Sequence, residues 1–156
     1  MNKIVFFLIL MTMSSVCWAN NPTVKEIRLL YYQAADNKMA VKKLIDLLAP
    51  YNKKNNTLFL GYGAAATMMM ARHTYNPFAK LSHFNKGKRM LEKAIEADHK
   101  NIELRFLRFT AQTNAPAFLG YNDHVLSDKA FLLRHVSELT DIDLQKLINK
   151  YLKDFS

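Results

Sequence analysis

The sequence lacks three features that would narrow its function: a second cysteine, the alternation of a β-strand, and a recognisable catalytic motif. It has one cysteine, Cys17, among 156 residues. No stretch alternates convincingly between apolar and polar residues, which argues against a sheet. It has no glycine-rich phosphate loop and no Gly-x-Ser-x-Gly turn. These absences favour an all-α protein without an evident chemical activity.

The first 19 residues have the layout of a secretory signal peptide. Lys3 precedes an apolar run from Ile4 to Met13, and Cys17-Trp18-Ala19 ends the segment with small residues at the cleavage positions. The apolar run is shorter than the roughly 20 residues that a spanning helix needs. We therefore expect residues 1–19 to be removed and 20–156 to form a single domain. A lipid anchor on Cys17 is the alternative, but Val16 does not suit that signal.

Loss of the leader would leave no cysteine and would lower the net charge from +9 to +8, because Lys3 leaves with it. The mature chain could then form no disulfide, and it could not use cysteine for catalysis or metal binding. Its lysines are dispersed, without a block of five like charges. Dispersed charge is typical of solvated helix surfaces and does not favour nucleic acid as a partner.

Apolar residues recur at the helical period along the rest of the chain, which predicts a stack of about seven antiparallel helices. The third predicted helix is apolar almost all round, which is typical of a helix buried on several sides. Gly61 and Gly63 lie inside it and suggest close approach of a neighbouring helix or a ligand. The predicted helices span about 22–36, 38–48, 57–73, 82–97, 102–113, 123–137 and 141–155.

Residues 87–109 resemble the junction between two tetratricopeptide repeats. Leu91 and Ala94 fit the packing positions of the second repeat helix, and residues 94–101 resemble the Ala-x-x-x-Asp-Pro-x-Asn ending, with His99 in place of the proline. A wider pattern over residues 59–121 resembles a set of small exported bacterial proteins with no assigned activity. The resemblance implies a degenerate helix-hairpin stack, a fold that generally binds peptides or proteins. The tetrapeptide Phe-Leu-Gly-Tyr occurs twice, at 59–62 and 118–121.

The strongest candidate for a binding surface is a row on the fifth predicted helix. Arg105, Arg108 and Gln112 share one face of that helix, and two guanidinium groups one turn apart can hold carboxylates. The other candidates for this surface are Arg72, Asn76, Lys80 and Tyr121. Alternatively, Arg105 and Arg108 pair inside the protein with Glu103, Asp98 or Asp128.

The five histidines do not form a recognisable metal motif, because none are four residues apart on a helix. We expect no metal site and no cofactor. The sequence therefore predicts an exported, non-enzymatic binding or scaffold module, periplasmic or secreted, for a protein or peptide partner in the cell envelope. Two alternatives remain: a small hydrolytic enzyme with a site near His73, Asn76 and His124, and a basic protein that associates with a membrane surface through its last helix.

Overall fold

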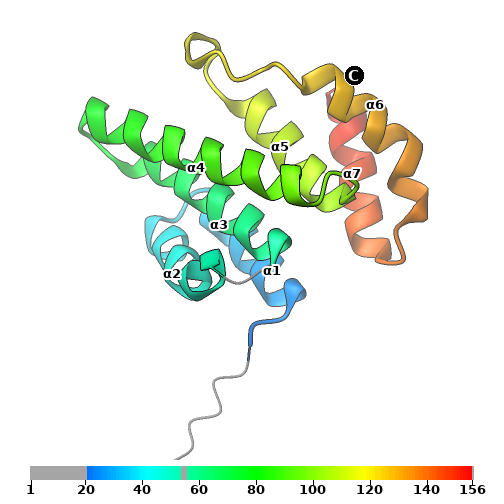
Figure 1. Cartoon of the computed structure of the whole chain (residues 1–156), viewed down its shortest axis with the longest axis horizontal. Coiled ribbons are helices and arrows are strands. Elements are labelled where there is room, and N and C mark those ends of the chain that lie inside the picture. Colours follow the sequence, from blue (N-terminus) through cyan, green and yellow to red (C-terminus); the bar gives the residue numbers. More distant parts are fainter. Residues whose placement is uncertain (1–20, 54–55, 156) are drawn as a thin grey trace, which may run out of the picture.

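The computed structural model describes residues 21–53 and 56–155. Within these ranges every regular element is helical, and the helices stack as successive hairpins, so the predicted all-α fold is confirmed (Figure 1). The predicted leader and Cys17 lie outside the described residues. The α-helices are α1 (Val24–Ala34), α2 (Lys38–Leu48), α3 (Thr57–Met70), α4 (Pro77–Ala97), α5 (Ile102–Asn114), α6 (Val125–His135) and α7 (Ile142–Asp154). Turns of 3-10 helix follow at Ala49–Lys53, Ala71–His73, Ala117–Leu119 and Val136–Glu138.

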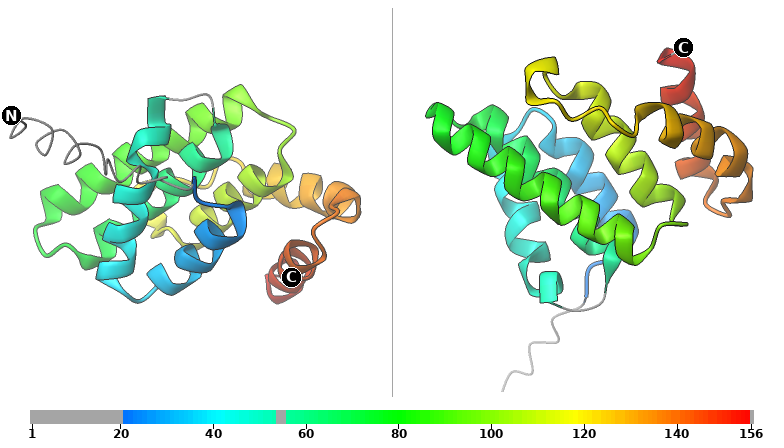
Figure 2. Two further views of the ribbon diagram at one scale, coloured as in Figure 1. Left: turned by 90° about the horizontal axis from the view of Figure 1, so that it is seen from below. Right: turned by 45° about the horizontal axis from the view of Figure 1, so that its top comes forward.

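Helix α3 is the centre of the larger part of the stack. It contacts α1, α2, α4 and α5, and the long α4 runs along one side of it (Figures 1 and 2). Its residues 61–68 are all buried, as expected of a helix without a polar face. Helices α6 and α7 lie on the other side of α5 from α1 and α2 (Figure 2). Helix α5 therefore joins two parts of the protein.

Each part has its own apolar core. The first is built around α3 and includes Tyr62, Leu91 and Leu104. The second includes Phe109 of α5, Leu132 of α6 and residues of α7. Because α5 supplies side chains to both, neither core can form completely without this helix.

Side-chain caps decide where the helices begin. The side chain of Thr23 accepts a hydrogen bond from the N–H of Glu26, whose carboxylate accepts one from the N–H of Thr23. This reciprocal pair starts α1 at Val24, so the prediction that Pro22 is the first helical residue is wrong.

The fourth helix begins earlier than predicted, at Pro77 rather than near Ser82. The sequence interpretation took Asn76-Pro77 only as a helix breaker. In the structure the Asn76 side chain accepts hydrogen bonds from the N–H groups of Phe78 and Ala79, and Pro77 occupies the first helical position, where no N–H is needed. Lys80 therefore lies on α4 rather than in a loop.

The last helix packs its apolar stripe into the second core. Leu144, Ile148 and Leu152 are buried, whereas Lys146 and Lys150 are exposed. The terminal helix therefore docks on the protein's own core. No described helix is both long enough and apolar enough to cross a bilayer.

Helices α3 and α4 meet so closely at Gly87 that a side chain there would collide with backbone. A Cβ atom on Gly87 would lie 2.6 Å from the carbonyl oxygen of Ala64 and 2.9 Å from the nitrogen of Met68. A Cβ on Gly61 would instead lie 2.2 Å from Cδ2 of Leu104, at the end of a side chain. Close approach of a neighbouring helix, one of the two explanations offered for Gly61, is thus observed.

We expect Gly87→Ala to lower the free energy of unfolding by about 1–3 kcal/mol, because two helix backbones must move apart. Alanine's greater helix propensity, worth about 1 kcal/mol, offsets only part of this cost. Gly61→Ala is the control and should cost less, since the Leu104 side chain can shift. Urea unfolding followed by circular dichroism would measure both. A Gly87→Ala protein at least as stable as Gly61→Ala would contradict this account of the contact.

Candidate functional site

The seven predicted binding residues fall into two groups in the structure. Arg105, Arg108, Gln112 and Tyr121 belong to a polar cluster around α5, whereas Arg72, Asn76 and Lys80 lie around the turn between α3 and α4. No hydrogen bond or ion pair between described residues joins the two groups. They are therefore considered separately.

The first group centres on Arg108, a residue that is only 4% exposed. Its Nε and Nη2 atoms donate to the two oxygens of Asp128 at 2.7 and 2.9 Å, and Nη1 donates to Glu92 at 2.7 Å. Asp128, on α6, is completely buried. A two-pronged bond of this kind fixes both the distance and the orientation of the two groups. It ties α5 to α6 and, through Glu92, to α4.

Arg105 also pairs with Asp128, but differently. Its Nε lies 2.5 Å from Oδ1 of Asp128, but the N–H group is not aligned with that oxygen and no hydrogen bond forms. The guanidinium carbon lies 4.7 Å from the centre of the Phe131 ring. Charge attraction and the aromatic face therefore hold Arg105. Of the internal partners considered for the two arginines, Asp128 is the one that both contact.

Gln112 and Tyr121 complete this Arg108 cluster, which comprises Glu92, Arg105, Arg108, Gln112, Tyr121 and Asp128. Gln112 is buried and accepts a hydrogen bond from the N–H of His124 at 3.2 Å. Tyr121 donates to Glu92 at 2.5 Å. Burial and this bond to Glu92 raise the pKa of Tyr121. In this arrangement the row on α5 holds helices together and offers little surface to a partner.

Sequence reasoning missed a second polar cluster, which comprises Arg28, Tyr62, Glu103 and Asp141. Arg28 of α1 donates to both oxygens of Glu103 at 2.9 and 3.1 Å, and to Asp141 at 2.8 Å. Tyr62 of α3 also donates to Glu103. Burial opposes the charge on Arg28, but the bonds to Glu103 and Asp141 outweigh it and raise the pKa of Arg28. This Arg28 cluster connects α1, α3, α5 and the start of α7.

The repeated tetrapeptide supplies one tyrosine to each cluster. Tyr62 and Tyr121 each donate to a glutamate that an arginine also binds. The backbones differ, because Gly61 is helical whereas Gly120 has the left-handed φ of 58°. The shared feature is therefore the role of the tyrosine hydroxyl and not a repeated fold.

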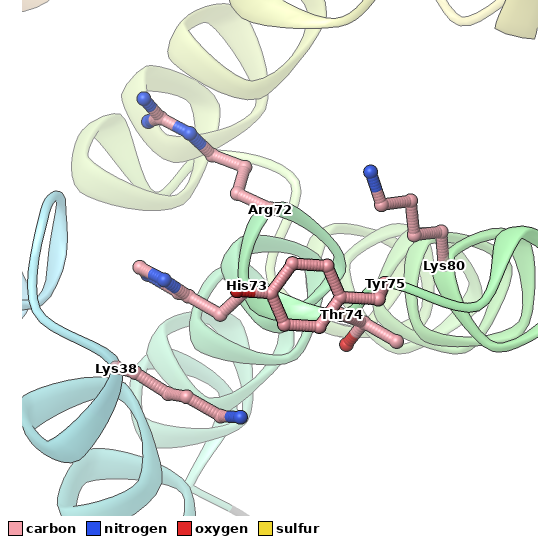
Figure 3. A pocket seen from close by; sticks show the side chains of 6 residues that line it. All are labelled: Lys38, Arg72, His73, Thr74, Tyr75 and Lys80. Atoms are coloured by element: carbon pink, nitrogen blue, oxygen red, sulfur yellow. The ribbon is translucent and has the colours of Figure 1, made fainter.

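The second group of predicted residues lies around a hollow of about 250 Å³ at the α3–α4 turn. Its lining combines basic and aromatic side chains (Figure 3). The lining residues are Lys38, Arg72, His73, Thr74, Tyr75 and Lys80. Arg72 and Lys80 were predicted for a binding site, but Lys38 and His73 were not grouped with them. Asn76 does not line the hollow but caps α4 beside it.

The charges around this hollow have little internal compensation. None of its lining residues is acidic. Asp36 lies 3.9 Å from Arg72, but both side chains are largely exposed, so the pair contributes little. Among the described residues, neither Lys38 nor Lys80 has an ion-pair partner. We name this feature, the six lining residues at the α3–α4 turn, the basic hollow.

Comparison of the chain with protein families, curated proteins and solved structures finds no match. In the described part of the chain, no three histidine, cysteine, aspartate or glutamate side chains are close enough together to hold a metal ion. The basic hollow is therefore the candidate functional site on its geometry and charge alone.

We expect Arg108→Met to destabilise the protein by about 3–5 kcal/mol, because it leaves the Asp128 carboxylate buried without its main partner. Adding Asp128→Leu should restore part of this loss, since it removes the buried carboxylate, while Arg105 and Glu92, which are more exposed, each lose a charged partner. Arg72→Met, at an exposed arginine, is the control and should change stability by about 0.5 kcal/mol or less. Urea unfolding would measure all three. If Arg108→Met is no more harmful than Arg72→Met, the internal role assigned to Arg108 is wrong.

The Asp141–Arg28 pair should make stability depend on pH in the acid range. The hydrogen bond from Arg28 lowers the pKa of Asp141 below its ordinary value of 3.8, with help from the Leu144 N–H. The stabilisation of the folded protein by this pair is therefore complete above pH 3.8. It is lost as the pH falls through the lower pKa that Asp141 has in the folded protein.

Asp141→Asn retains a helix cap but removes the charge. It should cost about 1 kcal/mol or less at neutral pH, because the carboxylate is partly exposed. The melting temperatures of the two proteins should converge in acid. A difference that stays constant from neutral to strongly acid pH would contradict the assignment.

Proposed function

We propose that the protein is an exported, non-enzymatic helical module that binds a protein or peptide partner in the cell envelope, and that the tip of the α3–α4 hairpin contacts the partner. The observation that carries the proposal is the set of large apolar side chains exposed beside the basic hollow. Tyr75 is 99% exposed and Phe78 is 83% exposed, and Leu81 follows one turn later on α4. Phe78 and Leu81 are three residues apart and so share a face of the helix.

Aromatic side chains and arginine are enriched where proteins bind one another, whereas exposed aromatic groups cost free energy when they remain in water. Tyr75 lies two residues after His73 and lines the same hollow as Arg72, so apolar and cationic groups are presented together. Such a surface suits a partner with both apolar and acidic groups. The resemblance of residues 87–109 to a tetratricopeptide-repeat junction supports a protein ligand by analogy, because stacked helix hairpins commonly bind peptides.

The enzyme alternative receives less support. A hydrolytic site would require a nucleophile or carboxylate beside a histidine base. The basic hollow contains His73, but its lining includes neither a carboxylate nor His124. Glu92, Glu103 and Asp128 are engaged by arginines instead.

The membrane-surface alternative depended on the last helix. The apolar face of α7 packs into the second core, so it is not available to insert between lipids without unfolding that core. Export itself rests on the signal-like layout of residues 1–19 and on the resemblance to exported proteins.

Capture of partners from a cell-envelope extract would test the proposal. The protein obtained by expressing the full chain would serve as bait beside Tyr75→Ser/Phe78→Ser. The control bait would be Leu126→Ser/Leu133→Ser, which removes two exposed apolar side chains from α6. We expect one protein, identified by mass spectrometry, to bind the wild type and the control and to be lost from the tip variant. The purified partner should then bind at a fixed ratio to the wild type.

Two results would count against the proposal. If no specific protein is captured by any bait, the binding function loses its basis. If a specific partner is retained by a folded Tyr75→Ser/Phe78→Ser variant, the protein is a binding module but its contact surface lies elsewhere. Circular dichroism of each bait would show that the helices are intact.

A further inference from the structure

The basic hollow differs from the two arginine clusters described above because no carboxylate is among the residues that line it. Arg28, Arg105 and Arg108 each lie within 3 Å of an internal carboxylate oxygen. Arg72 approaches an exposed carboxylate only at 3.9 Å. The protein has thus paired its buried cations and left a concentrated group of cations at the hairpin tip. Such a site attracts anions by charge complementarity.

The elements that build the hollow add positive potential. Lys38 is the first residue of α2, Lys80 lies in the first turns of α4, and the start of a helix carries partial positive charge. Neither helix has an acidic residue in its first turn, unlike α1, α5, α6 and α7. The starts of α2 and α4 therefore reinforce the side-chain charges, whereas the carboxyl end of α3, which also meets the hollow, contributes partial negative charge.

An unsatisfied atom in the lining points in the same direction. Nε2 of His73 is shielded from solvent and has no hydrogen-bond partner in the described structure. A buried polar atom without a partner costs free energy, and the cost disappears when a ligand supplies one. In Figure 3 His73 and Lys38 lie to one side of the Tyr75 ring, while the side chains of Arg72 and Lys80 extend away from the ring in two different directions.

A second hollow lies on α2, and its lining differs from that of the basic hollow in charge. It is lined by residues of α2 alone, namely Met39, Lys42, Lys43, Asp46 and Leu47. Asp46 places a negative charge beside the two lysines, and the site has no contribution from a second helix. The basic hollow has no such internal competitor in its lining.

We propose that the basic hollow binds the carboxylate of an acidic protein segment whose apolar side chains contact Tyr75 and Phe78. This inference rests on the proposed binding function and specifies the chemistry of the partner. A protein carboxylate is favoured because a guanidinium holds carboxylates in a planar, two-pronged geometry, and because exposed aromatic side chains lie beside the charge. The concave shape suits a single group better than a flat layer of lipid headgroups.

Fluorescence anisotropy with defined peptides would test the inference. The probe is a fluorescein-labelled peptide of alternating Glu and Leu residues, and its comparison is the same peptide with Gln in place of Glu. The protein is compared with Arg72→Gln/Lys80→Gln and with the control Lys146→Gln/Lys150→Gln, which removes the same charge from the exposed side of α7. We expect the Glu peptide to bind the wild type, and to bind the hollow variant roughly tenfold more weakly. The α7 control should bind within about twofold of the wild type.

Several results would overturn the inference. Equal weakening by the two double variants would show attraction to diffuse charge, and equal binding of the Gln peptide would show that carboxylates are not recognised. Inorganic phosphate and vesicles containing anionic phospholipid are tested in parallel. If either of these binds in a manner that requires Arg72 and Lys80 while the Glu peptide does not, the hollow serves phosphate groups instead.

The envelope capture separates this inference from the proposed function. If a partner is captured equally by wild type and by Arg72→Gln/Lys80→Gln, the binding function stands and the carboxylate site is wrong. If the Glu peptide binds the hollow but no envelope protein is captured, the site is supported and the proposed cellular role fails.

Discussion

The structure depends on two arginines that are buried against carboxylates along α5. Taking these charges out of water is unfavourable, and each arrangement offsets that cost only because its hydrogen bonds are short and directional. Arg108 binds Asp128 across the α5–α6 contact, and Glu103 receives Arg28 across the α1–α5 contact. An apolar contact tolerates sliding by a fraction of a turn, whereas a two-pronged ion pair does not. We infer that these pairs set the relative positions of the helices, while the two cores supply most of the stabilisation.

The protein uses its cations in two different ways. Inside the stack, each arginine meets a carboxylate, and a tyrosine hydroxyl completes the hydrogen bonding of one glutamate in each cluster. At the α3–α4 turn, Arg72, Lys80 and Lys38 remain grouped without comparable partners. The internal ion pairs fix the positions of the helices, and the grouped cations make one end of the molecule positively charged. This contrast, rather than the overall positive charge, singles out the basic hollow.

Helical periodicity was sufficient to predict the class of fold and most helix positions, because each helix buries one regular stripe. The errors of this prediction lie at two helix starts. The observed starts differ from the predicted ones because Thr23 caps α1 and because Asn76 caps α4 with Pro77 as its first residue. The shared face of Arg105, Arg108 and Gln112 was predicted from spacing, but spacing cannot show whether a polar face meets water or another helix. The Arg28 cluster was not predictable, since Arg28 and Asp141 are 113 residues apart. Arg72 and Lys80, which the sequence suggested as binding residues, both line the hollow, whereas Lys38 reaches it from a separate hairpin.

The long separation between Arg28 and its partners has a consequence for how the chain acquires its structure. A chain that emerges with its N-terminus first presents Arg28 on the first helix, but Glu103 follows 75 residues later and Asp141 later still. Until then Arg28 must stay hydrated, and the face of α1 that carries it cannot be buried without leaving a charge unpaired. The first hairpin can therefore form and pack on α3 early, but we infer that burial of the face of α1 that carries Arg28 requires the last third of the chain. Completion of the native state therefore requires α5 and the cap of α7, because they supply the partners of Arg28.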